Sequence, residues 1–192
     1  MRSVIAALQV SIDGFIEGPK GELDWVSTWE DPFGLSGQID ACVLGGGMYL
    51  GYEQYWRAIL ANPSGILSFT GQVPTAGEIE YARFANQTPH FVLTSTLRSV
   101  DWPVASIIRS VSEVALMKQQ PGKDIYAVGG AAFISSLMNA DLIDEIRLVV
   151  HPLVLGGGKA LFKDVNGRHA LALSGVRPIA SGAVRLIYRK SP

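Results

Sequence analysis

The chain has 192 residues, of which 48% are hydrophobic and 17% are charged, and its formal net charge is −1. This length and composition predict one globular domain, residues 1–192, with its own hydrophobic core, and they exclude a disordered chain. The near-zero net charge and the scattered basic residues give no reason to expect nucleic acid or a membrane as a partner.

The first residues of the chain do not have the pattern of a secretory signal, because Asp13 and Glu17 interrupt the apolar run. No apolar run reaches the roughly 18 residues that are needed to cross a bilayer. The single cysteine, Cys42, lies in an apolar run, which predicts a buried and unreactive thiol. These features favour the cytoplasm as the location.

Six β-type runs precede the C-terminal tail, and several are apolar along their whole length, as strands covered on both faces are. In chain order they occupy residues 3–10, 40–47, 90–97, 106–111, 124–130 and 145–155. Two more runs, near 171–179 and 183–189, flank Ser181-Gly182 and predict an antiparallel hairpin.

Helical patterns alternate with these strands. A helix carrying Tyr52, Tyr55 and Trp56 follows the second strand, and further helices are expected at 77–87, 112–118 and 131–140, with Ser112 as an N-cap. The alternation predicts an α/β sheet that ends in an antiparallel hairpin.

Three of the expected strands end in glycines or small hydroxyl residues: Gly45-Gly46-Gly47, Thr94-Ser95-Thr96 and Gly129-Gly130. Gly129-Gly130 alone is compatible with a tight turn, since glycine accepts positive φ, and with an anion site at a helix N-terminus. The carboxyl ends of parallel strands share one edge of a sheet, where ligands bind. The three strand ends together favour the anion site.

Several segments resemble, in the same order, the dihydrofolate-reductase-like superfamily, and most closely the branch with the reductase domain of bacterial riboflavin biosynthesis proteins. They are "SIDGFIEGPKGELDW", "DACVLGGGMYLGYEQYW", "HFVLTSTL" and "IYAVGGAAFISSLMNADLIDEIRLVVHPLVLGGGKALF". The resemblance covers nearly the whole chain and is most specific over 125–162. It implies a mainly parallel eight-stranded sheet flanked by helices, with a C-terminal antiparallel hairpin, and often a homodimer.

The resemblance also implies an NAD(P)H-dependent reductase, in which the cofactor lies across the strand ends and a hydride passes to a small pterin- or pyrimidine-like heterocycle. The residues that would border the cofactor by position are Gly14, Gly45, Gly46, Thr94, Ser95, Thr96, Gly129, Gly130, Ala131 and Ala132. Gly14 and the preceding Asp13 lie at the base of a loop that would cover the nicotinamide.

Three acidic residues are candidates for the catalytic site: Asp13, Glu30 and Asp31. A carboxylate can hold an amidine-like edge of a heterocycle by two charge-assisted hydrogen bonds and can supply a proton. The alternative for Glu30-Asp31 is the start of a helix. Trp25 and Tyr49 would border the substrate, although such aromatic residues are equally consistent with core packing.

The chain departs from its relatives at two places where they carry an arginine suited to a 2′-phosphate. "G-R-x-T-Y" is here "G-G-G-M-Y" (Gly45–Tyr49), and "S-R-T-L" is "T-S-T-L" (Thr94–Leu97). Arg98 either substitutes for them or points to solvent. The absence of these arginines weakens the expected contacts with a 2′-phosphate. By the resemblance NADP(H) remains the expected cofactor, with NAD(H) and the loss of cofactor binding as the alternatives.

A second function also fits the sequence, namely a non-catalytic small-molecule-binding protein on the same fold. A Rossmann-type dehydrogenase is disfavoured because no G-x-G-x-x-G follows the first strand. No metal site is expected, because the histidines are too dispersed for a ligand spacing, at His90, His151 and His169.

Overall fold

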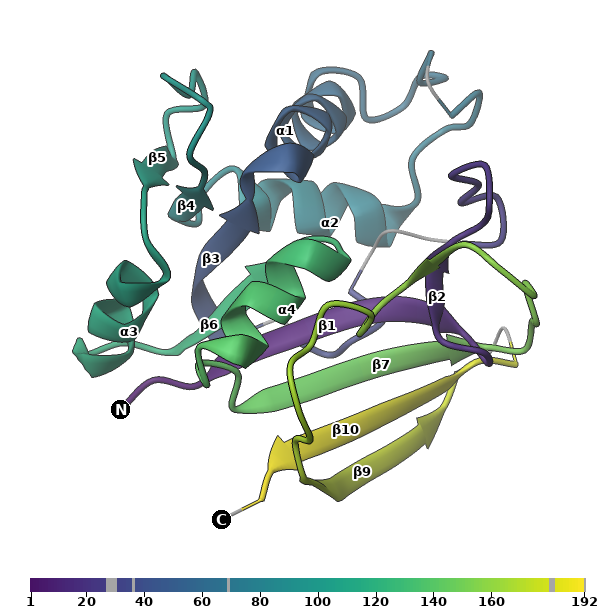
Figure 1. The fold of residues 1–192 in the computed structure, drawn as a ribbon. Helices are drawn as coiled ribbons and strands as arrows, with labels where there is room; N and C mark the ends of the chain where they lie inside the picture. Colours follow the sequence, from purple (N-terminus) through teal and green to yellow (C-terminus); the bar gives the residue numbers. More distant parts are fainter. Residues whose placement is uncertain (27–30, 36, 69, 180–181, 192) are drawn as a thin grey trace.

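An eight-stranded sheet forms the centre of the computed structural model, which describes residues 1–192 except 27–30, 36, 69, 180–181 and 192 (Figure 1). The strand order is β5-β4-β3-β6-β1-β7-β10-β9. The strands are β1 (Val4–Ser11), β3 (Ile39–Gly45), β4 (His90–Leu93), β5 (Ala105–Ile108), β6 (Asp124–Val128), β7 (Glu145–His151), β9 (Leu171–Pro178) and β10 (Val184–Lys190).

The strands from β5 to β7 run parallel to one another, whereas β10 pairs antiparallel with β7 and β9 pairs antiparallel with β10. This arrangement confirms the predicted mainly parallel sheet with a C-terminal hairpin. The turn of that hairpin lies partly outside the described residues, because Ser181 is not among them. A separate antiparallel pair, β2 (Phe15–Glu17) and β8 (Lys159–Ala160), is too short to have given a sequence signal.

Four helices in the described part of the chain cover the sheet: α1 (Gly46–Ala61), α2 (Ala76–Ala85), α3 (Val111–Gln119) and α4 (Ala131–Asn139). The buried side chains of α1 and α2 join one core cluster, and those of α3 and α4 join a second cluster. Figure 1 shows the corresponding arrangement, with α4 in front of the central strands and α1 and α2 behind them.

The almost continuously apolar sequence of β1 is explained by its burial on both faces of the sheet. Val4, Ala6, Leu8 and Val10 pack into the cluster on the α4 face, whereas Ile5 and Ala7 belong to the cluster on the α1 face. A strand that is covered by helices on both faces needs apolar side chains at successive positions.

Two predicted boundaries are corrected by local hydrogen bonds. The strand expected to reach residue 97 ends at Leu93, because the hydroxyl of Thr94 accepts the N–H groups of Thr96 and Leu97 and turns the chain. The N-cap of α3 is Ser110 rather than Ser112. The Glu113 carboxylate accepts the Ser110 N–H at 3.0 Å and completes a capping box.

Candidate functional site

Two helices begin directly at the carboxyl ends of neighbouring strands. Gly45 ends β3 and is the N-cap of α1, and Gly130 follows β6 and is the N-cap of α4. Neither helix has a side-chain cap, whereas α2 and α3 begin with complete capping boxes. The strands pair in register up to Leu44 and Val128, so the two uncapped helix ends lie at the same edge of the sheet.

A positive φ is not the reason why glycine occupies positions 129 and 130. Gly130 has a φ of −82°, and Gly129 is not among the glycines of positive φ. Packing explains Gly129 instead, since a Cβ there would lie 2.3 Å from Cδ1 of Phe133. A Cβ at Gly130 would meet only Cδ1 of Ile16, at 3.9 Å, so the space beside Gly130 is open.

The glycines at the end of β3 are also closely packed. A Cβ at Gly45 would lie 2.9 Å from Cβ of Phe133, and one at Gly46 would lie 2.6 Å from Cβ of Thr94. These contacts bring the ends of β6, β3 and β4 together, as the sequence led us to expect. Ala131 is buried behind this edge and Ala132 is exposed on it.

The end of β4 presents two exposed residues, Ser95 and Thr96, beside the buried Thr94. No motif in the sequence marks Arg109, which directly follows the neighbouring strand β5. Its guanidinium Nη1 donates a hydrogen bond to the carbonyl oxygen of Thr94 at 2.9 Å. Because the two residues follow different strands, only the pairing of β4 with β5 could have revealed this contact.

The loop after β1 is fixed by Asp13 and Gly14. The Asp13 carboxylate accepts the N–H groups of Leu155 (3.2 Å) and Gly156 (2.8 Å), in the loop after β7. The pKa of Asp13 is lowered, chiefly by a hydrogen bond with the Ser11 side chain and further by these backbone donors. Gly14 has a φ of +84°, which favours glycine. Asp13 thus holds two loops together as a carboxylate.

Trp25 lies against His151 at the end of β7, with ring centroids 5.2 Å apart and the rings nearly perpendicular. His151 Nε2 is 2.7 Å from Oε1 of Gln9 on β1. Burial lowers the pKa of His151, so the neutral imidazole is favoured. The structure thus places Trp25 beside the carboxyl end of β7, at the expected edge of the sheet.

The remaining candidates differ in their positions. Asp31 is half-buried, accepts the N–H groups of Phe33 (3.2 Å) and Leu35 (2.7 Å), and lines a cavity of about 350 Å³ between its own segment and α2. Glu30 lies outside the described residues. Tyr49 is only 1% exposed, and its hydroxyl accepts the N–H of Trp102, so it lies within the core.

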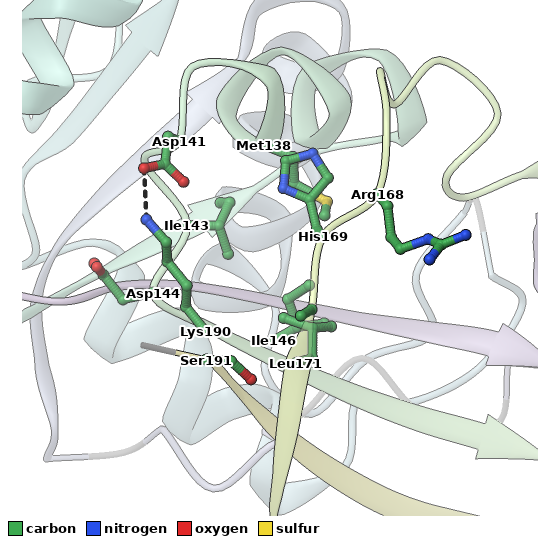
Figure 2. A pocket seen from close by; sticks show the side chains of 11 residues that line it. Met138, Asp141, Ile143, Asp144, Ile146, Arg168, His169, Leu171, Lys190 and Ser191 are labelled. Atoms are coloured by element: carbon green, nitrogen blue, oxygen red, sulfur yellow. Dashed lines mark hydrogen bonds and ion pairs between the residues drawn. The ribbon is translucent and has the colours of Figure 1, made fainter.

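A second cavity, of about 220 Å³, opens at the opposite end of the sheet, where β7 begins and β10 ends (Figure 2). An ion pair between Lys190 and Asp141 (2.5 Å) lies at its rim, and the side chain of Arg168 points away from it. None of the residues that the sequence singled out as site residues lines this cavity. It is therefore separate from the carboxyl edge of the sheet.

The described residues hold neither a cluster of metal ligands nor a helix that could span a membrane. No three of their His, Cys, Asp or Glu side chains come together as metal ligands would. None of the helices in that part of the chain has both the length and the apolar character needed to cross a bilayer.

The fold and sequence match known proteins over nearly the whole chain. The model of the RibD C-terminal domain matches residues 2–185. The uncharacterized protein YyaP of Bacillus subtilis is 35% identical, over 97% of this chain and 94% of its own. A structure from Shewanella sp. PV-4, described as a riboflavin biosynthesis protein, has a TM-score of 0.69 and 20% identity, and the match covers 99% of each chain.

A dihydrofolate reductase from Enterococcus faecalis, solved with NADP(H), has a TM-score of 0.58 and 14% identity, over 99% of this chain and 97% of its own. At these identities the two solved structures establish the fold alone, which is dihydrofolate-reductase-like. The family model goes further, because it matches nearly the whole chain: the chain belongs to the RibD C-terminal domain family.

Proposed function

We propose that residues 1–192 act as one NAD(P)H-dependent reductase domain whose substrate is a small pterin- or pyrimidine-like heterocycle. The observation that carries this proposal is the pair of uncapped helix N-termini at the ends of β3 and β6. Unpaired N–H groups and the positive end of the helix dipole favour an anion at such a place.

The residues at this edge fit a dinucleotide pyrophosphate. The backbone N–H groups of Ala131 and Ala132 belong to the first turn of α4, and that of Gly46 to the first turn of α1. The open space beside Gly130 would let an anion approach the α4 backbone closely. A side chain at position 130 would occupy that space. Thr94, Ser95 and Thr96 would face the adenosine half of the cofactor.

A bound reduced nicotinamide would supply a hydride, while the chain positions the substrate, excludes water and delivers a proton. We propose that Trp25, held against His151, forms one wall of the substrate cleft. Asp31 is the described acid that we propose as the proton donor, with Glu30 as the other candidate. We assign Asp13 to holding the loop after β1, because its carboxylate joins that loop to the backbone of Leu155 and Gly156 in the loop after β7.

A homodimer is the proposed oligomeric state, and the cytoplasm is the proposed location. The outermost strand β9 exposes Leu173 (56%) and Val176 (57%), which supports contact with a second copy. Light scattering on the purified chain would give twice the chain mass for a homodimer and the chain mass for a monomer.

The alternative function is a binding protein on the same fold that takes up a small molecule without reducing it. A reductase should consume NADPH or NADH when an oxidised pterin or pyrimidine is added, and this consumption is followed by the loss of nicotinamide absorbance. Nucleotide binding without consumption of NADPH or NADH, with any of these pterins or pyrimidines, would favour the non-catalytic binding protein.

The Gly130→Val variant tests the nucleotide site directly. The backbone at Gly130 has ordinary angles, and a Cβ there has no neighbour closer than 3.9 Å, so we expect the variant to fold. We expect nucleotide binding to be nearly abolished. Gly51→Val is the matched control, because a Cβ at Gly51, further along α1, meets nothing within 4 Å. Unchanged nucleotide affinity in a folded Gly130→Val protein would refute the assignment.

A further inference from the structure

The cavity at the start of β7 and the end of β10 takes no part in the proposed reductase reaction (Figure 2). Its volume of about 220 Å³ is below the roughly 300 Å³ at which pockets for drug-sized ligands begin. The cavity therefore suits a small metabolite rather than a dinucleotide.

Four apolar side chains line this cavity. Met138 of α4 and Ile143 are each 7% exposed, and Ile146 of β7 is 1% exposed. Leu171, at the start of β9, is 38% exposed. A hydrocarbon group in the cavity would cover the exposed part of Leu171 and would itself leave water, and both changes favour binding.

A pair of opposite charges lies at the rim of the cavity, where Lys190 Nζ is 2.5 Å from Asp141 Oδ2. The side chains of Lys190 and Asp141 are 45% and 67% exposed, so a ligand can reach both. An ammonium has three N–H donors and a carboxylate has two oxygens. Among the described residues this one contact is the only side-chain hydrogen bond of either group. Both groups therefore retain capacity for a ligand.

Asp141 occupies a backbone position where glycine is usual. Ala140 is the C-cap of α4, and the next residue, Asp141, has a φ of +59°. The N–H of Asp141 donates to the carbonyl of Met138 (2.9 Å), and that of Leu142 donates to the carbonyl of Leu137 (3.0 Å). These two bonds form a Schellman motif, which glycine fits with least strain. An exposed ion pair stabilises a fold only weakly, so stability alone does not account for the carboxylate at position 141.

We propose that this cavity binds a small aliphatic amino acid, with its side chain on the apolar residues and its charged groups on Lys190 and Asp141. The ammonium and carboxylate of an α-amino acid are attached to the same carbon and lie close together, as the two charges of the ion pair do. The ligand carboxylate would bind Lys190 and the ligand ammonium would bind Asp141, so that the four charges alternate in sign. A ligand with a single charge would instead place a like charge beside one of the two residues. The inference does not depend on the proposed function.

The test is an NMR titration of the intact, isotope-labelled chain with L-leucine. We expect saturable shifts of the amide signals of Asp141, His169 and Leu171, with a dissociation constant on the order of 1 mM. Three related compounds each lack one part of leucine: isocaproate lacks the ammonium, isoamylamine lacks the carboxylate, and glycine lacks the side chain. Each should bind about tenfold more weakly or worse, because a charge-assisted hydrogen bond or the apolar contact is lost.

Two variants remove one charge each from the rim. Asp141→Gly should fold, since glycine is preferred at this position, and Lys190→Gln changes a half-exposed side chain. We expect each change to weaken leucine binding about tenfold or more. Arg168→Gln is the matched control, because Arg168 borders the cavity but its side chain points away from it (Figure 2). This variant should keep the wild-type affinity.

Several results would overturn the proposal. They are the absence of saturable shifts with leucine up to about 20 mM, and shifts confined to the carboxyl edge of the sheet. Equal affinity for leucine and either singly charged compound would refute the role of the paired charges, and equal affinity for glycine would refute that of the apolar side chains. Unchanged leucine affinity in a folded Asp141→Gly protein would refute the assignment of the ammonium to Asp141. None of these results would affect the proposed reductase, which the binding of NADPH tests separately.

Discussion

Gly129 faces the ring of Phe133 so closely that a Cβ at position 129 would lie 2.3 Å from the Cδ1 atom of that ring. Phe133 also approaches Gly45 on the neighbouring strand, where a Cβ would lie 2.9 Å from its own Cβ. One aromatic residue in the first turn of α4 therefore requires glycine at the ends of both β3 and β6. Gly130, which this ring does not restrict, is the glycine whose open space suits a ligand.

We expect Gly129→Ala to destabilise the fold by about 1–3 kcal/mol, because the added methyl group overpacks against Phe133. Combining it with Phe133→Ala should remove that clash, so the two changes together should cost at least about 1 kcal/mol less than the sum of the single effects. Chemical denaturation of the four proteins measures this coupling. Strictly additive effects would show that the ring is not what requires glycine at 129.

Asp13→Ala should speed hydrogen exchange at the amides of Leu155 and Gly156, because it removes the acceptor of both N–H groups. Since Asp13 is exposed, we expect little change in global stability. Asp24→Ala removes the same charge from an exposed position in the same part of the chain and should leave both amides unchanged. Equal exchange rates in the Asp13→Ala and wild-type proteins would contradict the proposed role of Asp13 in joining the two loops.

Arg147→Met should destabilise the protein by about 3–5 kcal/mol, as expected when one partner of a buried ion pair is removed. Arg147 is only 6% exposed and donates to Glu145 at 2.6 Å and to the carbonyl oxygens of Phe33 and Gly34. The Arg189 side chain binds the same carboxylate but is 67% exposed. Arg189→Met should therefore cost less than about 1 kcal/mol. Similar losses for the two variants in urea denaturation would refute this distinction.

Stability should fall between pH 6.5 and pH 4 because of His90. Burial lowers the pKa of His90 to about 4, and its ring nitrogens lie 2.7 Å from the Thr88 carbonyl and 3.3 Å from the Tyr52 hydroxyl. In this pH range the unfolded chain takes up a proton at His90 and the folded chain does not, so acid favours unfolding. The loss should approach about 3 kcal/mol at pH 4.

The His90→Gln variant isolates this contribution from those of the other titrating groups. It should be less stable than the wild-type protein at pH 7, and the difference between the two should shrink as the pH falls to 4. His169→Gln, at an exposed histidine, should follow the wild-type curve. Parallel curves for His90→Gln and wild type in pH-dependent urea denaturation would refute the prediction.

The sheet could be predicted from the sequence because burial on both faces leaves a direct pattern. The apolar run in β1 and the glycines at the ends of β3 and β6 are local features of the sequence. The strands and their shared edge could therefore both be predicted. The β2–β8 pair could not be predicted, because β2 has three residues and β8 has two, which is too short for a periodic pattern. Its existence depends on contacts between distant segments.

The candidate site was harder to predict, because sequence order does not determine which side chains meet. The position of Arg98 next to the β4 loop makes it the arginine that the sequence suggests, whereas Arg109 is the residue whose guanidinium contacts Thr94, because β4 and β5 pair. Tyr49 looked suited to a cleft but is buried in the core. The glycines of the edge were recognised, but the part that Phe133 plays in requiring them needed the packing of α4 on the sheet.

The most direct test of the proposed function is a calorimetric titration of the purified, intact wild-type chain with NADPH and then with NADH. A nucleotide site built from the N-termini of α1 and α4 predicts saturable binding of one NADPH per chain, with a dissociation constant on the order of micromolar. Absence of binding by both nucleotides, in a protein shown to be folded, would contradict the account and leave the non-catalytic binding protein as the better description.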